Sequence, residues 1–331
     1  MFVRRLVAPV TAVLSLSLAA ATAGATAAPD AAPATFVGVD GLVHESAPIV
    51  VRGIDNELYP GWELDYACGS GGDTLDTWIT QLGKLAAVLE KAGTRVVFTI
   101  APGKTWGLGD RLDPTRFPHG SCDSVGIAEG NKVLDEKRPS YLPMRPLLSS
   151  RAHQMYWKTD PHWTTVGGSR FARGVAAALD RRLARRQRYA YTTETRWGNL
   201  AEDIGDPTPE VVERAIPDSG VTVRDAKGAP DWSGYPSITF DTSWVSSPAK
   251  KTWPGRTLLV GDSFTWYALE SLRPVFRQGR FIWVTQVPYP QLIDAMVHAD
   301  TVVLEGYSSF PSPIEMGWFR RDVKKALARQ R

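Results

Sequence analysis

The chain has 331 residues, of which 43% are hydrophobic and 22% are charged, and its formal net charge is +3. This length is sufficient for one large α/β domain or for two small ones. Because basic and acidic residues nearly balance, the composition gives no support for nucleic acid as a partner.

Residues 1–27 are typical of a secretory signal peptide. Two arginines open the segment, an apolar stretch follows over residues 6–23, and Ala-Thr-Ala precedes the expected cleavage after Ala27. We expect a flexible leader over residues 28–35 and a mature protein that is secreted or held in the extracytoplasmic cell envelope. The alternative is that the segment remains as a membrane anchor.

The chain contains two cysteines, Cys68 and Cys122. Both lie in Gly/Ser-rich sequence, which predicts loops, and an even pair in an exported chain predicts one disulfide. Two free thiols are the alternative. A structural zinc site is not expected, since zinc is held by four ligands in such sites.

The first half of the chain predicts one long helix followed by a buried strand. Leucines and a tryptophan at spacings of three and four predict a helix that starts near Asp73 or Thr74 and ends at Gly93. The continuous apolar run over residues 95–100 predicts a strand of a parallel sheet. Residues 103–150 are rich in proline and glycine and predict a long irregular excursion over the surface.

The second half predicts alternating helices and strands. Thr164 can cap a helix whose apolar face reaches Leu183 and whose end carries a run of arginines. We read this run as a solvated face, with an anionic-polymer site as the alternative. Residues 190–255 look irregular. Short strands are predicted at 257–260, 281–284 and 301–304, with helices after 263 and over 313–328. The pattern predicts an α/β fold with a mostly parallel sheet flanked by helices and with long irregular surface insertions.

Ser263 directly follows the predicted strand 257–260, in the segment Gly-Asp-Ser-Phe. Residues just beyond the carboxyl end of a parallel strand line the ligand crevice of such sheets. A serine hydroxyl there could act as a nucleophile if a base accepts its proton. The alternative is an ordinary serine that caps the next helix. The segment is not the Gly-x-Ser-x-Gly turn of α/β-hydrolases, because Thr265 replaces the second glycine.

His162 and Asp160 could supply the base and its orienting carboxylate. They stand in the segment Asp-Pro-His-Trp, and Pro161 favours an extended Asp160, whose carboxylate can reach back to the imidazole. The alternative is a histidine that packs in the core beside a tryptophan. A metal site built on His153 and His162 is not favoured, since their separation fits no common zinc spacing.

Aromatic residues gather near both segments. Most tryptophans belong to protein cores, but aromatic rings also form platforms for sugar rings. We predict that Trp163 or Tyr267 faces a substrate.

These segments resemble those of the SGNH-like family of exported alginate O-acetyltransferases and related polysaccharide O-acetylation proteins. The resemblance rests on the Asp-x-His-Trp segment at 160–163 followed by Gly-Asp-Ser-Phe at 261–264, with weaker similarities at 38–43, 198–201 and 300–305. It implies a single SGNH-like catalytic domain over residues 36–331. It further implies Ser263 as nucleophile, His162 as general base and acid, and Asp160 as its orienting group.

The same resemblance implies an activity. We expect an exported O-acetyltransferase that moves an acetyl group to polysaccharide or oligosaccharide hydroxyls through an acetyl-serine, the donor being relayed by a membrane acyltransferase. A secreted carbohydrate acetylesterase with the same triad and a non-catalytic glycan-binding scaffold are the alternatives. No cofactor, metal or nucleic acid is expected. Candidates for oxyanion or substrate binding are Asn199, Trp163, Tyr267 and Lys104.

Overall fold

The computed structural model describes residues 35–37, 43–45, 50–112, 121–149, 154–206, 208–227, 240–309 and 312–330. The predicted signal peptide and all of the predicted leader except Thr35 lie outside these ranges. Residues Ala34–Arg331 form one compact unit. None of the helices in the described ranges is long and apolar enough to cross a membrane.

The central sheet of this unit has six strands, which are β5 (Arg95–Ala101), β8 (Thr222–Lys227), β9 (Asp241–Ser247), β10 (Trp253–Gly261), β11 (Phe276–Trp283) and β12 (Thr301–Tyr307). Their order is β5-β12-β10-β11-β9-β8. The first four are mutually parallel, whereas β9 runs antiparallel to β11 and β8 antiparallel to β9. The four strands predicted from apolar runs correspond to these parallel strands.

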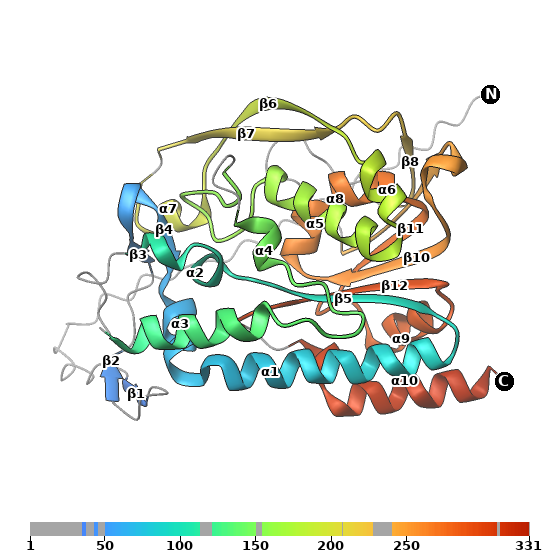
Figure 1. Ribbon diagram of the computed structural model, residues 1–331, viewed down its shortest axis with the longest axis horizontal. Coiled ribbons are helices and arrows are strands. Elements are labelled where there is room, and N and C mark those ends of the chain that lie inside the picture. Colours follow the sequence, from blue (N-terminus) through green and yellow to red (C-terminus); the bar gives the residue numbers. More distant parts are fainter. Residues whose placement is uncertain are drawn as a thin grey trace, which may run out of the picture. The chain divides into compact units, whose positions relative to one another are not determined.

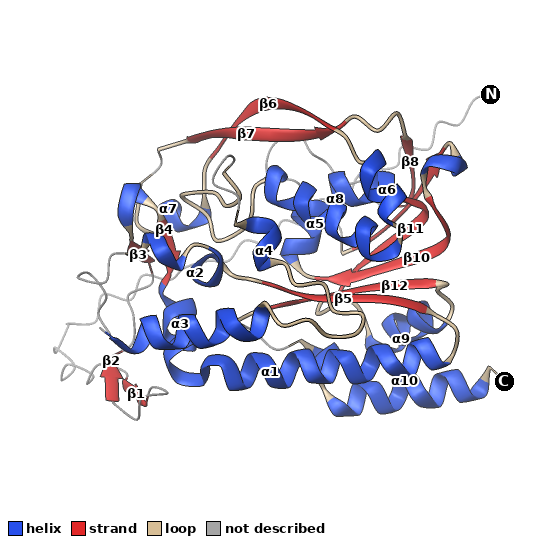
Figure 2. Ribbon diagram, in the orientation of Figure 1, coloured by secondary structure: helices blue, strands red, loops and turns tan. Residues whose placement is uncertain are grey.

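Helices cover both faces of the sheet (Figures 1 and 2). On one face lie α1 (Gly61–Lys91), α9 (Tyr289–Val297) and α10 (Gly317–Arg329), and on the other lie α5 (Thr165–Leu179) and α8 (Ser263–Leu272).

Successive residues of β10 explain this arrangement. Leu258 and Val260 belong to the core shared with α1, α9 and α10, whereas Leu259 belongs to the core shared with α5 and α8. Neighbouring side chains of a strand point to opposite faces, so a strand with helices on both sides reads as a continuous apolar run. The predicted fold class, a mostly parallel α/β sheet flanked by helices, is confirmed.

Helix α1 starts earlier than predicted. It begins at Gly61 rather than near Asp73, and it ends before Gly93, whose φ of 99° stops the helix. The glycines of residues 69–72 weaken a helix by about 1 kcal/mol each, which made this stretch look like a loop. The fully buried Leu64 and Ala67 show that the first turns pack into the core, and this packing outweighs the weak local preference.

The predicted excursion over residues 103–150 contains regular structure. It includes α2 (Lys104–Gly107), α3 (Ser121–Leu134) and α4 (Arg145–Leu148), and α3 packs along α1 (Figure 1). Glycines obscured the helical pattern of α3 in the sequence. The packing of this helix explains why one of them, Gly130, has no side chain. A Cβ at this position would lie 2.1 Å from the ring of Trp106.

The two cysteines lie in helices rather than in the predicted loops. Cys68 belongs to α1 and Cys122 belongs to α3. Their side chains are outside the described part of the structure, so the disulfide stays a prediction.

Thr164 caps α5 as predicted, with its hydroxyl accepting a hydrogen bond from the amide of Gly167 at 3.2 Å. The helix ends at Leu179, and Asp180 caps a separate helix, α6 (Arg181–Arg186), which carries Leu183 and most of the arginine run.

The region predicted as irregular holds β6 (Tyr189–Arg196), α7 (Asn199–Asp203) and β7 (Glu210–Pro217). Strands β6 and β7 form a long antiparallel pair that lies over α5 and α8 (Figure 1). Two shorter antiparallel pairs precede α1, one of β1 (Thr35–Val37) and β2 (Val43–Glu45), the other of β3 (Val50–Arg52) and β4 (Leu58–Pro60).

Candidate active site

Ser263 is the first residue of α8, directly beyond the carboxyl end of β10. The cap of this helix is Asp262, whose carboxylate accepts a hydrogen bond from the amide of Phe264 at 2.8 Å. The capping role that was the alternative interpretation of Ser263 therefore belongs to its neighbour. Ser263 sits in the first turn, where main-chain N–H groups have no partner within the helix.

A buried carboxyl group supports the turn before Ser263. Glu305, on the adjacent strand β12, accepts hydrogen bonds from the amide of Asp262 at 3.1 Å and from the hydroxyl of Thr265 at 2.8 Å. Burial and the nearby Asp262 raise the pKa of Glu305 well above its ordinary value. Gly261 is required for this contact, since a Cβ there would lie 2.5 Å from Glu305 and 2.2 Å from Thr265.

A tight hairpin presents His162 and Asp160. The amide of Thr164 donates to the carbonyl of Met155 at 2.8 Å, and the amide of Trp157 donates to the carbonyl of His162 at 3.2 Å. These two bonds close the hairpin, so that Asp160 and His162 stand at its turn.

The hairpin brings His162 against Ser263. Nε2 of His162 lies 2.7 Å from Oγ of Ser263, although the residues are 101 positions apart. On the other side of the ring, Nδ1 lies 2.7 Å from Oδ1 of Asp160. An ionised carboxylate only accepts hydrogen bonds, so Nδ1 carries the proton and a neutral imidazole offers Nε2 as acceptor to the serine hydroxyl.

Asp160 is 5% exposed and is held by main-chain donors. The amide of His162 donates to Oδ1 at 2.9 Å, and the amide of Asn199 donates to Oδ2 at 3.2 Å. Burial by itself would raise the pKa of Asp160, but the imidazole of His162 and these amides lower it below its ordinary value. The carboxylate is thus kept ionised beside the imidazole.

Ser263 and His162 open into a pocket of about 280 Å³. Its other walls are mainly apolar and come from several elements, namely Trp62, Pro161, Asp262, Phe264, Val284, Thr285, Tyr307 and Ser312. The rings of Phe264 and Tyr267 pack against His162, with centroids 4.9 and 4.5 Å away.

The structure gives two of the four candidate binding residues internal roles. Trp163 is fully buried and packs against Phe171 and Phe264, so it cannot face a substrate. Lys104 is also fully buried, and its ammonium binds main-chain carbonyls rather than a ligand.

The other two candidates lie next to Asp160 and His162. Asn199 binds Asp160 through its main chain and is absent from the described residues that line the pocket. Tyr267 is partly exposed beside His162 and remains a candidate for substrate contact.

Sequence reasoning missed Glu57 and Glu210. Both are buried carboxylates near the hairpin, and Glu210 accepts hydrogen bonds from the amides of Lys158 and Thr159. Neither stands in a segment with a recognisable pattern, so the sequence carried no signal for them.

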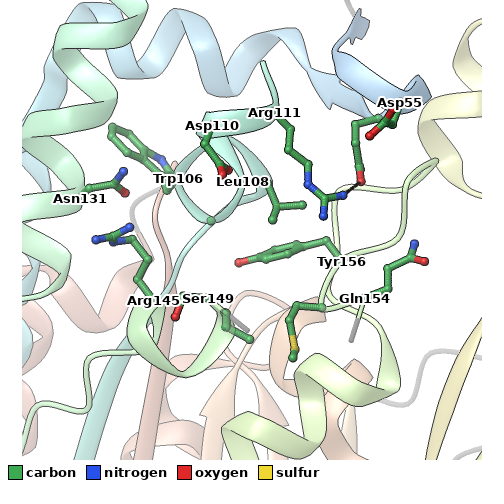
Figure 3. Close-up of a pocket in the computed structure, with 15 residues that line it drawn as sticks. Asp55, Trp106, Leu108, Asp110, Arg111, Asn131, Arg145, Ser149, Gln154 and Tyr156 are labelled. Atoms are coloured by element: carbon green, nitrogen blue, oxygen red, sulfur yellow. Dashed lines mark hydrogen bonds and ion pairs between the residues drawn. The ribbon is translucent and has the colours of Figure 1, made fainter. Parts of the chain in front are cut away.

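A larger cavity of about 600 Å³ lies beside the same hairpin (Figure 3). Gln154 and Tyr156 line it, and the guanidinium of Arg111 pairs with Glu57 at its wall, with 2.7 Å between the charged atoms. The side chains of Ser263, His162 and Asp160 do not contribute to its wall. Ser263 and His162 line the smaller pocket instead, which makes that pocket the candidate active site.

Within the described ranges, no group of three or more His, Cys, Asp or Glu residues is arranged to hold a metal ion. His153, the other half of the metal pair considered from the sequence, lies outside those ranges.

Comparison with known proteins shows the family to which the chain is similar. A family model described as "SGNH hydrolase-like domain, acetyltransferase AlgX" matches residues 50–214. Over 143 residues the chain is 27% identical to a probable alginate O-acetylase AlgJ of Pseudomonas syringae pv. tomato. That match covers 42% of this chain and 35% of the relative, so the chain spans about a third of the length of the curated protein it matches.

Two solved structures share the fold. Bacillus cereus PatB1 with a sulfonyl adduct gives a TM-score of 0.54 at 16% identity, covering 80% of this chain and 96% of that chain. Pseudomonas aeruginosa AlgX gives a TM-score of 0.54 at 14% identity, covering 84% of this chain and 65% of that chain. With this shared fold, the family match shows that the chain belongs to the SGNH hydrolase-like acetyltransferase family of AlgX and AlgJ.

Proposed function

We propose that this protein is an exported O-acetyltransferase that acetylates hydroxyl groups of a polysaccharide through an acetyl-serine at Ser263. The observation that carries the proposal is the continuous hydrogen-bonded arrangement from Asp160 through His162 to Ser263, with 2.7 Å at each contact of the imidazole. The names of the family and of its AlgJ relative support acetyl transfer to a polysaccharide.

In the first half-reaction, Oγ of Ser263 attacks the carbonyl carbon of an acetyl donor while Nε2 of His162 takes the hydroxyl proton. The resulting imidazolium is stabilised by Asp160 and passes that proton to the leaving group as the donor ester breaks. General base help of this kind is worth about 10²–10⁴-fold in rate. The N–H of Ser263 in the first turn of α8 is a candidate donor to the developing oxyanion.

In the second half-reaction, a sugar hydroxyl attacks the carbonyl carbon of acetyl-Ser263. His162 removes the proton of the attacking hydroxyl and returns it to Oγ of Ser263 as that oxygen leaves. The products are the O-acetylated sugar and the free enzyme. Water in place of the sugar would give acetate, so exclusion of water by the apolar pocket walls separates a transferase from an esterase.

The signal-peptide pattern of residues 1–27 supports export of the protein, and export limits which acetyl donors can reach it. An exported protein has no supply of cytoplasmic thioester, so we infer that a membrane acyltransferase relays the acetyl group. N-terminal sequencing of protein recovered from the cell envelope or medium tests the export step, with Ala28 as the expected first residue.

The proposal is tested by trapping the acyl-enzyme. The mature protein is incubated with 4-nitrophenyl acetate and digested, and the peptide that contains Ser263 is examined by mass spectrometry for an added acetyl group. We expect the adduct in the wild type and in Ser149→Ala, which alters the larger cavity, but not in Ser263→Ala. An unlabelled wild type, or equal labelling of Ser263→Ala, would contradict the proposal.

A second measurement separates transfer from hydrolysis. The acetyl-enzyme is mixed with polysaccharide fragments, and acetyl groups on sugar and free acetate are both counted. Transfer to sugar supports the proposal. Acetate alone with every acceptor offered indicates an acetylesterase, and glycan binding without turnover of any ester indicates a scaffold protein.

A further inference from the structure

The residues that lead into Asp160, here called the Asp160 loop (residues 157–160), are held by buried charges from other parts of the chain. On one side stands Lys104, the first residue of α2, which is fully buried. Its Nζ lies 2.6 Å from the carbonyl oxygen of Trp157 and 2.7 Å from that of Lys158. A third oxygen, Oε2 of Glu57, lies 3.0 Å away.

These three oxygens define the charge state of Lys104. An ammonium has three N–H donors and no acceptor, so it matches three surrounding oxygens in number. A neutral amine would turn its lone pair toward one of them. Burial lowers the pKa of Lys104, and Glu57 opposes this effect by both charge and hydrogen bonding. A buried ammonium persists only with such partners.

On the other side of the loop stands Glu210, the first residue of β7, which is 9% exposed. Its carboxylate accepts hydrogen bonds from the amide of Lys158 at 2.8 Å, and from the amide and hydroxyl of Thr159 at 3.0 and 2.9 Å. The side-chain amide of Gln154 also donates to it. Hydrogen bonds to charged groups are about twice as strong as neutral ones.

The two charges therefore hold complementary main-chain groups of one short segment. The ammonium of Lys104 takes carbonyls, and the carboxylate of Glu210 takes amides, on either side of Lys158. Asp160 follows directly, and its carboxylate must meet Nδ1 of His162 at 2.7 Å. Neither Lys104 nor Glu210 is among the described residues that line the pocket at Ser263.

We propose that Lys104 and Glu210 are positioning residues, which clamp the Asp160 loop so that Asp160 holds His162 in register with Ser263. The inference rests on the proposed function, because the alignment of His162 with Ser263 matters only if His162 acts as the base. It assigns the buried lysine a role in aligning the catalytic groups rather than in contacting a ligand.

The inference is tested by the hydrogen bond itself. Proton NMR in water at low temperature follows the Nδ1 proton of His162, which resonates downfield of the amide protons when it is bonded to a carboxylate. Asp160→Asn identifies the signal by removing it. The test variants are Lys104→Met and Glu210→Gln, which delete one charge each at similar size. Lys158→Met is the matched control, because that ammonium points away to the carbonyl of Asp55 at 3.3 Å.

We expect the signal in the wild type and in Lys158→Met, and its loss or a clear shift in both test variants. For 4-nitrophenyl acetate, kcat should fall about 10–100-fold in the test variants while KM stays nearly unchanged, because small misplacements of catalytic groups lower the rate of the chemical step. A lower melting temperature with an unchanged signal and unchanged kcat would show a merely structural role and overturn the inference.

Two provisions keep the test decisive. If Lys104→Met does not fold, Lys104→Met/Glu57→Gln removes both charges of the buried pair, and loss of the signal is expected there too. The signal needs no turnover, so an inactive wild type that shows it would contradict the proposed function and leave the clamp supported by its variants. A wild type without the signal would overturn the clamp whatever its activity.

Discussion

The main-chain amide of Asn199 donates a hydrogen bond to Oδ2 of Asp160 at 3.2 Å, which connects the start of α7 to the carboxylate that contacts His162. Gly198, the residue before Asn199, allows this close approach. Gly198 lies so close to Thr159 that a Cβ would stand 2.0 Å from its carbonyl oxygen. The amides of Leu200 and Ala201 donate to the same oxygen at 3.0 and 3.2 Å, so the Asp160 loop and α7 form one connected unit.

Gly198→Ala should therefore displace the Asp160 loop. The φ of Gly198 is −98°, which any residue adopts, so lack of space is the whole cost. We expect a loss of about 1–3 kcal/mol in the free energy of unfolding, as for other overpacked sites. We also expect kcat to fall about 100-fold because Asp160 moves with the loop. Urea unfolding and ester turnover measure the two effects.

Gly83→Ala is the matched control for this substitution. A Cβ at Gly83, inside α1, would meet the ring of Phe98 at an ordinary 3.5 Å. Replacing a helical glycine by alanine should then stabilise the protein by about 0.5–1 kcal/mol without changing kcat. Equal behaviour of the two variants would contradict the close-packing argument.

Asp160→Asn should leave the fold intact and lower kcat by about 10²–10⁴-fold. The amide nitrogen of asparagine is a donor, so it no longer favours the imidazole tautomer that offers Nε2 to Ser263. Binding of substrate at the pocket should change little. Steady-state kinetics with 4-nitrophenyl acetate check this, and a variant with wild-type kcat would remove Asp160 from the mechanism.

The sequence predicted those features of the fold and of the candidate site that short segments determine by themselves. The parallel strands appear as continuous apolar runs because helices cover both of their faces, and β10 delivers Ser263 to the end of the sheet where ligands bind. Asp160 and His162 stand two residues apart, so their contact is local. Their approach to Ser263 was implied only by the family resemblance.

What the sequence did not reveal depends on distant partners. Lys104 was a candidate for oxyanion or substrate binding, yet it is fully buried and its ammonium contacts Glu57 and carbonyls of the Asp160 loop. Trp163 looked like a sugar platform because it adjoins His162, but its ring lies in the core with Phe171. In each case contacts between residues far apart in the chain outweighed the local pattern.

Tyr267 offers the next test, since its partly exposed ring lies 4.5 Å from the ring of His162. We expect Tyr267→Ala to lower kcat/KM for transfer to an oligosaccharide by about tenfold, the size of one aromatic contact. Tyr267→Phe keeps the ring and should retain most of the activity. If Tyr267→Phe were as weak as Tyr267→Ala, the hydroxyl rather than the ring would matter.

The predicted disulfide is tested by thiol chemistry. Cys68 in α1 and Cys122 in α3 belong to helices that pack against each other. We expect denatured, unreduced protein from the cell envelope to resist iodoacetamide and to take up two labels after reduction. Cys68→Ser should cost about 2–4 kcal/mol in the free energy of unfolding. Two labels without reduction would show free thiols.

The pH dependence of stability should reflect Glu315, a carboxyl group that is 2% exposed. Burial raises its pKa from 4.5 to about 8, although the amide of Ser312 opposes the rise. Between these two values the folded protein binds more protons than the unfolded chain. Stability from this group is complete below pH 4.5 and is lost as the pH rises through 8. The loss is at most about 1.4 kcal/mol per pH unit.

Glu315→Gln should remove this dependence, because glutamine resembles the protonated acid and does not titrate. The amide of Ser312 donates to Oε2 of Glu315 at 2.8 Å, and the amide oxygen of glutamine can accept the same bond. We expect urea unfolding to give similar stabilities for the variant and the wild type at pH 5, and a more stable variant at pH 8. Glu202→Gln, at an exposed position of α7, should track the wild type at both values. A gap between Glu315→Gln and the wild type that stays constant with pH would mean that Glu315 is ionised in the folded protein throughout this range, since only a proton held by the native state makes the gap grow with pH.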